Sequence, residues 1–464
     1  HADSNPDTGV SNFLSAPPYC EYKHFEIARK QVASRTKDGE GNGRPASSLR
    51  PQSERTVTQR KEPKAMTEKS EPLATNIYKE ALALKDQMIR WRRALHREPE
   101  VGLHLPKTSA FLKARLEEMG IEYTTLVDGS CITATLGQGE PCIMLRADCD
   151  ALPIKEMSGE SFASENEAMH ACGHDMHAAM LLGAAKMLKE RESQLAGRVK
   201  LFFQPGEEAA HGAATCVEEG ILENPAPDVA FALHVASQVP VGVFAWGSKA
   251  LARAHNFKVT VTGVGGHGSM PYMCVDPITP AAYIHLGLQE LLTREIKGSD
   301  EAVITIGAFQ AGEASNVIPQ TAVLKGNMRT FDDEVHDFLY KRIGEIAPAI
   351  AQTYRASAVV ESISDDPMLV CDIDLSRLAS DAIKCAVPGA QVLDDKLHVM
   401  GSEDFSYIAR ELPSTYFMVG AKMADTENIY GQHHPQVRFN EDCLPIGAAA
   451  HTAVALAWLE KQSA

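Results

Sequence analysis

The stretch Val199-Lys-Leu-Phe-Phe-Gln-Pro-Gly-Glu-Glu208 carries the clearest fold signal of this chain. It begins as an apolar run typical of a buried strand, breaks at Pro205-Gly206 and ends on two adjacent carboxylates. Strand-like runs of this kind alternate with helical patterns. The runs cover 131–136, 142–147, 229–233 and 414–419, and the helical patterns cover 77–97, 107–119, 178–190 and 444–459. The alternation predicts an α/β fold, with an open, mostly parallel mixed sheet and helices on both faces.

Side chains suited to metal binding stand on four separate segments, each just past a strand-like run or in a turn rich in Gly and Pro. Active-site groups of open α/β sheets collect at the carboxyl ends of the strands, so these segments are expected to meet. Thiolate, imidazole and carboxylate together suit zinc, manganese, cobalt or nickel. One acid of the Glu-Glu pair is left over as a base for hydrolysis. The candidates are Cys172 and His174, Glu207 and Glu208, His234, and His433 or His434.

Each segment taken alone has a simpler interpretation. Cys172 could be a buried thiol beside a surface histidine, and Glu207 and Glu208 could be two solvated acids. His234 could be a structural histidine at a strand end. The metal site is therefore predicted by the set as a whole.

Further residues are expected beside the ligands rather than among them. Asp148 and Asp150 end the run 142–147 and are predicted to orient ligands. His170 and His177 flank the Cys172 segment, and one of the two suits a place behind the ligands or on a helix face better than a place on the metal.

The 464 residues are enough for two or three domains. Residues 1–72 are polar and without periodicity, which is typical of a disordered or extended tail. This segment lacks the apolar centre of a secretory signal, and its first methionine is Met66, so an upstream-extended reading frame would explain it. We expect it to carry no chemistry.

The order of expected elements changes after Trp246. Strand and helix patterns then follow as β-α-β-β-α-β, the order of a ferredoxin-like sandwich. They cover 257–262, 277–297, 303–309, 322–329, 332–353 and 358–363. We therefore predict an inserted domain over 247–366 and a catalytic domain made of 73–246 and 367–464.

This predicted inserted domain holds a second group of candidates. His267 lies in the Gly-rich turn Gly263–Ser269, which lacks the strand–turn–helix context of a nucleotide-binding loop. Asn316 and Arg329 could bind a carboxylate, because a guanidinium matches two carboxylate oxygens. The alternative for Arg329 is a solvated side chain at a strand end.

Charge and composition argue against several classes of binding partner. A formal net charge of -16 argues against nucleic acid and anionic membranes. No run of eighteen apolar residues occurs, so no membrane span is predicted. The ten cysteines are scattered, which favours reduced thiols and a cytoplasmic protein.

Eight ordered motifs between Tyr78 and Leu459 resemble one known family, and chance agreement of all eight is negligible. This family is the metal-dependent N-acyl-amino-acid amidohydrolases, which include hippurate hydrolase and plant auxin-conjugate hydrolases and form a branch of the aminoacylase and carboxypeptidase G group. The motifs are Leu95–Gly102, Arg146–Pro153, Met169–Asp175, Phe203–Glu208, Gly265–His267, Asn316–Pro319, Gly401–Phe405 and His433–Pro435.

The resemblance implies a detailed site. Two divalent metal ions would be held by Cys172, His174, Glu208, His234 and His433, with His434 as the alternative to the last. The ions would lower the pKa of the attacking water and polarise the scissile carbonyl. Glu207 would be the general base, taking a proton from the water and passing it to the departing amine.

The resemblance also implies that a second subunit takes part. His267 would reach the active site of a partner subunit and stabilise the oxyanion. Asn316 and Arg329 would bind the substrate carboxylate, and the inserted domain would form a homodimer or a higher homo-oligomer. The chain has Gly206 where many relatives have Ala, and Asn327-Met328 where they often have Thr and an aliphatic residue. These departures leave the acyl and amino-acid preferences open.

Three functions are weighed on this basis. The first is hydrolysis of N-acyl or N-aroyl amino acids to a carboxylic acid and a free amino acid. The second is a dipeptidase or carboxypeptidase on the same scaffold. The third is a non-catalytic binding protein, against which the complete ligand set and the spare glutamate argue.

Overall fold

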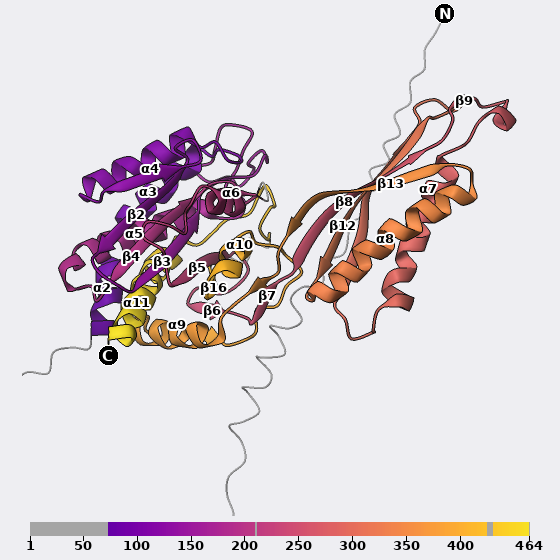
Figure 1. The fold of residues 1–464 in the computed structure, drawn as a ribbon. Helices are drawn as coiled ribbons and strands as arrows, with labels where there is room; N and C mark the ends of the chain where they lie inside the picture. Colours follow the sequence, from indigo (N-terminus) through magenta and orange to yellow (C-terminus); the bar gives the residue numbers. More distant parts are fainter. Residues whose placement is uncertain (1–72, 209–210, 425–429, 464) are drawn as a thin grey trace, which may run out of the picture. The chain divides into compact units, whose positions relative to one another are not determined.

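The computed structural model of the chain describes residues 73–208, 211–424 and 430–463. The predicted tail of residues 1–72 lies outside them. The largest sheet of the described residues has eight strands in the order β1-β2-β4-β3-β5-β16-β6-β15 (Figure 1). These are β1 (Tyr123–Leu126), β2 (Cys131–Gly137), β3 (Cys142–Asp148), β4 (Arg198–Gln204), β5 (Val229–Ala236), β6 (Val243–Ala245), β15 (Gln391–Leu393) and β16 (Ser414–Gly420).

The four central strands of this sheet, β4, β3, β5 and β16, run parallel, and antiparallel pairs flank them on both sides. Strand β3 pairs in parallel with β4 and with β5, and β5 pairs in parallel with β16. Strands β1 and β2 add antiparallel pairs at one side, and β6 runs antiparallel to β16 at the other. All seven residues of β3 are buried, as expected for a central strand covered on both faces. The predicted α/β fold with a mostly parallel mixed sheet is confirmed.

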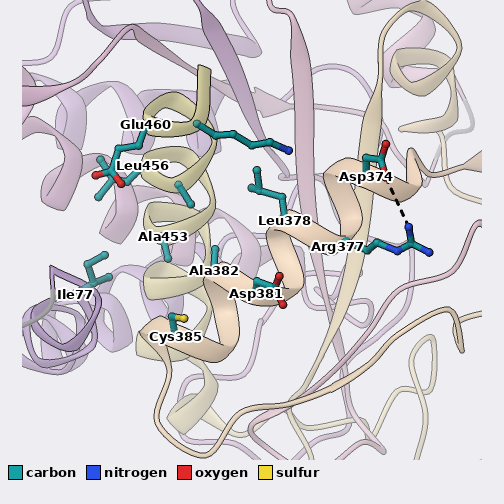
Figure 2. A pocket seen from close by; sticks show the side chains of 12 residues that line it. Ile77, Asp374, Arg377, Leu378, Asp381, Ala382, Cys385, Ala453, Leu456 and Glu460 are labelled. Carbon is teal, nitrogen blue, oxygen red and sulfur yellow. Dashed lines mark ion pairs between the residues drawn. The ribbon is translucent and has the colours of Figure 1, made fainter. Parts of the chain in front are cut away.

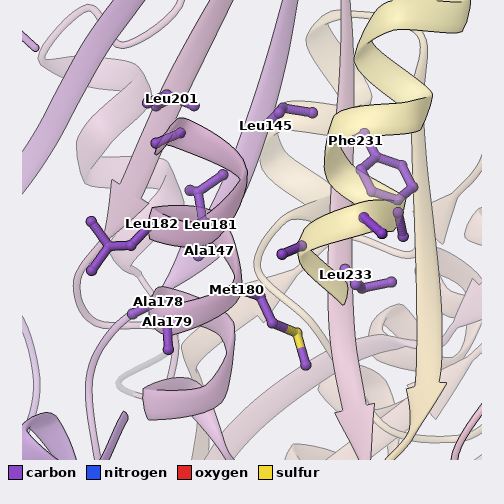
Figure 3. Close-up of a cluster of buried hydrophobic side chains, with 14 of the residues drawn as sticks. Leu145, Ala147, Ala178, Ala179, Met180, Leu181, Leu182, Leu201, Phe231 and Leu233 are labelled. Carbon is purple, nitrogen blue, oxygen red and sulfur yellow. The ribbon is translucent and has the colours of Figure 1, made fainter. Parts of the chain in front are cut away.

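Helices cover both faces of the sheet. One face packs against α2 (Leu73–Ala83), α3 (Lys85–Arg97), α4 (Pro106–Glu118), α5 (His174–Lys189), α9 (Ile373–Ala386) and α11 (Leu444–Ser463). Figure 3 shows part of this core, where side chains of β3, β4 and β5 meet those of α5. The other face packs against α6 (Gly212–Glu218) and α10 (Ser406–Glu411).

The second sheet has four antiparallel strands in the order β10-β12-β8-β13. The strands are β8 (Arg253–Thr262), β10 (Ala302–Ala311), β12 (Thr321–Thr330) and β13 (Ser357–Asp366). Helices α7 (Ile278–Glu290) and α8 (Asp333–Thr353) pack on one face and share a core with it (Figure 1). The predicted β-α-β-β-α-β order is confirmed, whereas the domain boundaries at 247 and 366 stay a prediction.

Two predicted helices differ in detail. The helical pattern at 77–97 falls into α2 and α3, separated by the single turn residue Leu84. The pattern at 277–297 ends as a regular α-helix at Glu290 and continues as a π-helical turn over Leu291–Glu295. Two short ribbons complete the described strands; they pair β9 (Gly266–His267) with β11 (Val317–Ile318), and β7 (Lys249–Leu251) with β14 (Leu369–Val370).

One helix among the described residues is long and apolar enough to cross a membrane by length and composition. It covers Glu441–Ser463, and 89% of its apolar window is buried inside the protein. Its side chains pack mainly against α5 and α9, so its apolar character is that of a core helix.

Candidate metal centre

The ligand candidates from four distant segments meet at one place. Donor atoms of Cys172, His174 and Glu208 all lie within 4.8 Å of one another. His234 Nε2 lies 3.4 Å from the Cys172 sulfur, and His433 Nε2 lies 3.4 Å from Glu208 Oε1. Ligands that each stand about 2.0–2.3 Å from one cation are separated by distances of this size.

The turn before α5 holds Cys172 and His174 at the cluster. Gly173 between them has φ +93, a left-handed conformation that L side chains rarely adopt. A Cβ atom at this position would stand 2.4 Å from Val235 Cγ2 on β5. Only glycine therefore allows the turn to approach so closely the strand that carries His234.

His174 and His234 each use one ring nitrogen in a contact away from the cluster, which leaves the other nitrogen of each ring facing the cluster. His174 Nδ1 lies 3.3 Å from Asp150 Oδ1, and His174 Nε2 is buried without a hydrogen-bond partner. His234 Nδ1 donates to the Val235 carbonyl at 2.7 Å, so its Nε2 carries the lone pair beside Cys172. Asp150 also accepts the backbone N–H groups of Glu207 and Glu208, at 3.0 and 3.1 Å.

The unpartnered atoms show that the donor set fits a cation. Glu208 Oε1, like His174 Nε2, is buried and has no hydrogen-bond partner. A buried polar atom without a partner costs about 1–3 kcal/mol, so such atoms need a specific explanation. A divalent ion that accepts electron pairs from thiolate, imidazole and carboxylate would satisfy both.

His433 rather than His434 faces this cluster. His433 has φ +66, and its backbone N–H donates to the Ala171 carbonyl at 3.0 Å. The ring of His434 instead stacks on Tyr430, with centroids 4.0 Å apart. The neighbouring Cys172 thiol and Glu208 carboxylate raise the pKa of His433 to about 10.

Asp148 and His177 form a separate support behind the ligands. Asp148 Oδ1 accepts from His177 Nδ1 at 2.5 Å, and its other oxygen accepts from Arg146 at 2.9 Å. His177 Nε2 accepts the N–H of Val235 at 2.9 Å. Both nitrogens of His177 are therefore occupied, and this ring has no lone pair left for a metal, although its donors lie within 4.8 Å of those of His174 and His234.

His170 stands apart from this support. It is buried, neither of its ring nitrogens has a hydrogen-bond partner, and burial lowers its pKa to about 3.

Glu207 belongs to a second acidic group next to the cluster. Its carboxylate lies within 4.8 Å of those of Glu403 and Asp404. Burial, followed by the charges of Glu403 and Asp404, raises the pKa of Glu207 well above its ordinary value. Arg146 donates to Glu403 at 2.8 Å and to Asp404 at 3.1 Å, which partly balances the three acids.

Glu403 and Asp404 lie in the motif Gly401–Phe405, but the sequence alone predicts no role for either residue. The motif was the only signal in the sequence, because the contacts around this acidic group join residues that are distant in the chain. Gln204 and Asp404, for example, are 200 positions apart.

The candidates of the predicted inserted domain do not all reach the cluster. Within the described part of the chain, the side-chain bonds of His267 involve only Ser269, and its ring is exposed on β9. Asn316 is also exposed, and its carbonyl accepts from Gly268. Arg329 is half-buried and donates to the Met400 carbonyl at 3.1 Å, just before the Gly401–Phe405 motif.

A groove elsewhere on the protein lies away from the ligand candidates. It has a volume of about 700 Å³ and lies between α9 and α11 (Figure 2). Its lining includes Leu378, Ala382, Leu456 and the exposed Cys385, and none of the predicted ligands.

A metal-donor cluster at the carboxyl ends of central parallel strands is typical of a metal-dependent hydrolase with an α/β fold. The chain belongs to peptidase family M20/M25/M40, whose family model matches residues 144–457. It is 37% identical over 386 residues to IAA-amino acid hydrolase ILR1-like 2 of Arabidopsis thaliana, covering 82% of this chain and 86% of that protein. It is 36% identical to N-acetyl-L-cysteine deacetylase of Bacillus subtilis (strain 168), covering 78% of this chain and 85% of that protein.

A solved structure supports the same conclusion. The Bacillus subtilis YXEP protein, described as a dinuclear metal binding peptidase from the M20 family, matches with a TM-score of 0.69 and 30% identity. The match covers 82% of this chain and 99% of that chain. The chain is therefore a metal-dependent amidohydrolase of this family, and the family expected from the motifs is confirmed.

Proposed function

We propose that the protein hydrolyses the amide bond of N-acyl or N-aroyl amino acids, releasing a carboxylic acid and a free amino acid. The observation that carries the proposal is the cluster of Cys172, His174, Glu208, His234 and His433 beside the separate carboxylate of Glu207. Two relatives support the substrate class, because by name one hydrolyses IAA-amino acids and the other deacetylates N-acetyl-L-cysteine.

The five clustered residues would hold two divalent ions, of zinc, manganese, cobalt or nickel. When bound, the ions supply Lewis-acid activation of water and of the scissile carbonyl. Asp150 and Asp148 act behind them: Asp150 holds the ring of His174 and the backbone of Glu207 and Glu208.

Glu207 is proposed as the general base. It would accept a proton from the attacking water and deliver it to the nitrogen of the departing amine. The raised pKa of Glu207 suits the second step, which Glu207 enters in its protonated form. Cations bound at the neighbouring Glu208 would favour the ionised form of Glu207, which the first step needs.

A homodimer would bring in the remaining groups. His267 of the partner subunit would stabilise the oxyanion, while Asn316 and Arg329 would bind the substrate carboxylate. Exposed apolar side chains near His267 support an interface there; Tyr272 is 78% and Met273 66% exposed. All cysteines of the described residues are free thiols, which suits the proposed cytoplasmic location.

A dipeptidase or carboxypeptidase activity is the second candidate, because the YXEP structure is described as a peptidase. A panel of substrates separates the two. Enzyme of defined metal content would be assayed with N-acetyl amino acids, N-benzoylglycine, indoleacetyl amino acids and unblocked dipeptides. We expect higher kcat/KM on the acylated amino acids. Preference for dipeptides would favour the peptidase, and no turnover with any of the four metals would contradict both.

A further inference from the structure

The motif Leu95–Gly102 has no part in the cluster described above, yet its histidine is buried among charges. His96 and Arg92, both on α3, are each 2% exposed, and Asp175 on α5 is 1% exposed. Charged side chains are rarely this buried unless each has a partner.

One side of His96 faces the start of α5. His96 Nδ1 lies 2.8 Å from Asp175 Oδ2, and Arg92 Nε donates to the same oxygen at 2.6 Å. Asp175 directly follows His174 in the chain. The contact therefore ties α3 to the turn that carries Cys172 and His174.

The other side of His96 faces a different segment. His96 Nε2 lies 3.1 Å from Glu156 Oε1, and Glu156 also accepts the N–H of Ser164 at 2.6 Å. The next residue, Met157, donates its N–H to the Pro435 carbonyl at 2.7 Å. Pro435 stands two residues after His433, so this segment is joined to the turn that carries the last ligand candidate.

The ring of His96 bridges the two segments as a double donor. Both its nitrogens face carboxylate oxygens, which only accept, so both nitrogens must carry protons. Burial disfavours this charged form, but Asp175 and Glu156 outweigh burial and raise the pKa of His96.

We infer that His96 is a positioning residue that couples the turn bearing Cys172 and His174 to the turn bearing His433. This inference rests on the metal site of the proposed function. Residues that orient metal ligands through hydrogen bonds contribute about 10- to 100-fold to metal affinity. His96 would act in this way on two ligand segments at once, through Asp175 on one side and through Glu156 and Met157 on the other.

Cobalt binding tests the coupling without any assay of turnover. Co²⁺ would be titrated into metal-free full-length protein, and its affinity measured by competition with a chelator. The thiolate-to-cobalt charge-transfer band would report Cys172. We expect His96→Ala to bind Co²⁺ about 10- to 100-fold more weakly. The matched control is Lys200→Ala, because Lys200 is also buried, at 1% exposure, and its ammonium donates to the carbonyls of Ile221, Glu223 and Pro225 rather than to a ligand segment.

Glu156→Gln tests the same link from its other end and serves if His96→Ala does not fold. We expect it to weaken cobalt binding too, and His96→Ala with Glu156→Gln to be less than additive. Cobalt affinity unchanged in both variants, with stability lowered as in Lys200→Ala, would overturn the inference. A wild-type protein that shows no thiolate band would contradict the metal site itself, which separates the two failures.

Discussion

Glu207 and Glu208 are neighbours in the chain, and their surroundings push their pKa values in opposite directions. Burial opposes ionisation of both. For Glu208, His433 and His174 outweigh burial and lower the pKa. For Glu207, Glu403 and Asp404 add to burial and raise the pKa. Two acids separated in this way suit different tasks, one as a ligand and the other as a proton carrier.

The base assignment can be tested on this pair. Glu207→Gln should retain metal, because the substitution leaves every proposed ligand in place. It should lower kcat roughly 100- to 10,000-fold, since a positioned base contributes that much. Steady-state kinetics with elemental analysis of the same sample provides the measurement. Activity close to wild type would remove Glu207 from the proton transfers.

Cys172 can be tested by its effect on metal retention. Cys172→Ser replaces a thiolate by a neutral hydroxyl, a poorer ligand for these metals, so the metal content after dialysis should fall. Cys371→Ser is the control, because Cys371 is likewise a free thiol but is buried on another segment. Equal metal content in the two variants would exclude Cys172 as a ligand.

At the scale of elements, the turn before α5 is held by tight packing. Its Gly173 has both a left-handed backbone and a neighbouring strand within contact distance. The sequence pattern placed a helix at 178–190, but the structure begins α5 at His174. The extra turn of helix carries a ligand candidate and Asp175, which explains why few apolar positions mark it.

Gly173→Ala should disrupt this turn. Left-handed strain and overpacking each cost about 1–3 kcal/mol, so the free energy of unfolding should fall and metal affinity with it. Gly389→Ala is the matched control, because Gly389 has φ +77 but nothing within 4 Å of its added Cβ. Urea denaturation and metal titration of both variants would separate strain from steric clash. Equal losses in the two would contradict the role of close packing against β5.

At the scale of the whole molecule, the exposed His267 is the least explained of the predicted site residues. It lies on a ribbon beside exposed apolar side chains such as Val264 and Val317, 50% and 52% exposed. A side chain so placed can serve catalysis only if another surface covers it. The proposed partner subunit would provide that surface.

Mixed dimers test this arrangement. His267→Ala should lower kcat and keep the metal content of wild type. Equal amounts of His267→Ala and Glu207→Gln, unfolded and refolded together, should recover about a quarter of wild-type activity, because half of random dimers then contain one intact site. No recovery, with exchange of subunits verified by mass, would show that His267 does not act across the dimer.

Local patterns in the sequence predicted much of this protein. The order of strands and helices follows from hydrophobic periodicity, and the chemical types of the ligand candidates follow from short motifs whose residues are adjacent in the chain. These properties depend only on neighbours along the chain.

Only the tertiary structure decided which groups meet and in what orientation. It turned His433 toward the cluster and stacked His434 on Tyr430. It joined His96 to Asp175, which lies 79 positions further along the chain. It also gathered Glu403 and Asp404 around Arg146 beneath Glu207. Such contacts arise from the packing of helices and strands that are distant in the chain, and no local pattern of residues encodes them.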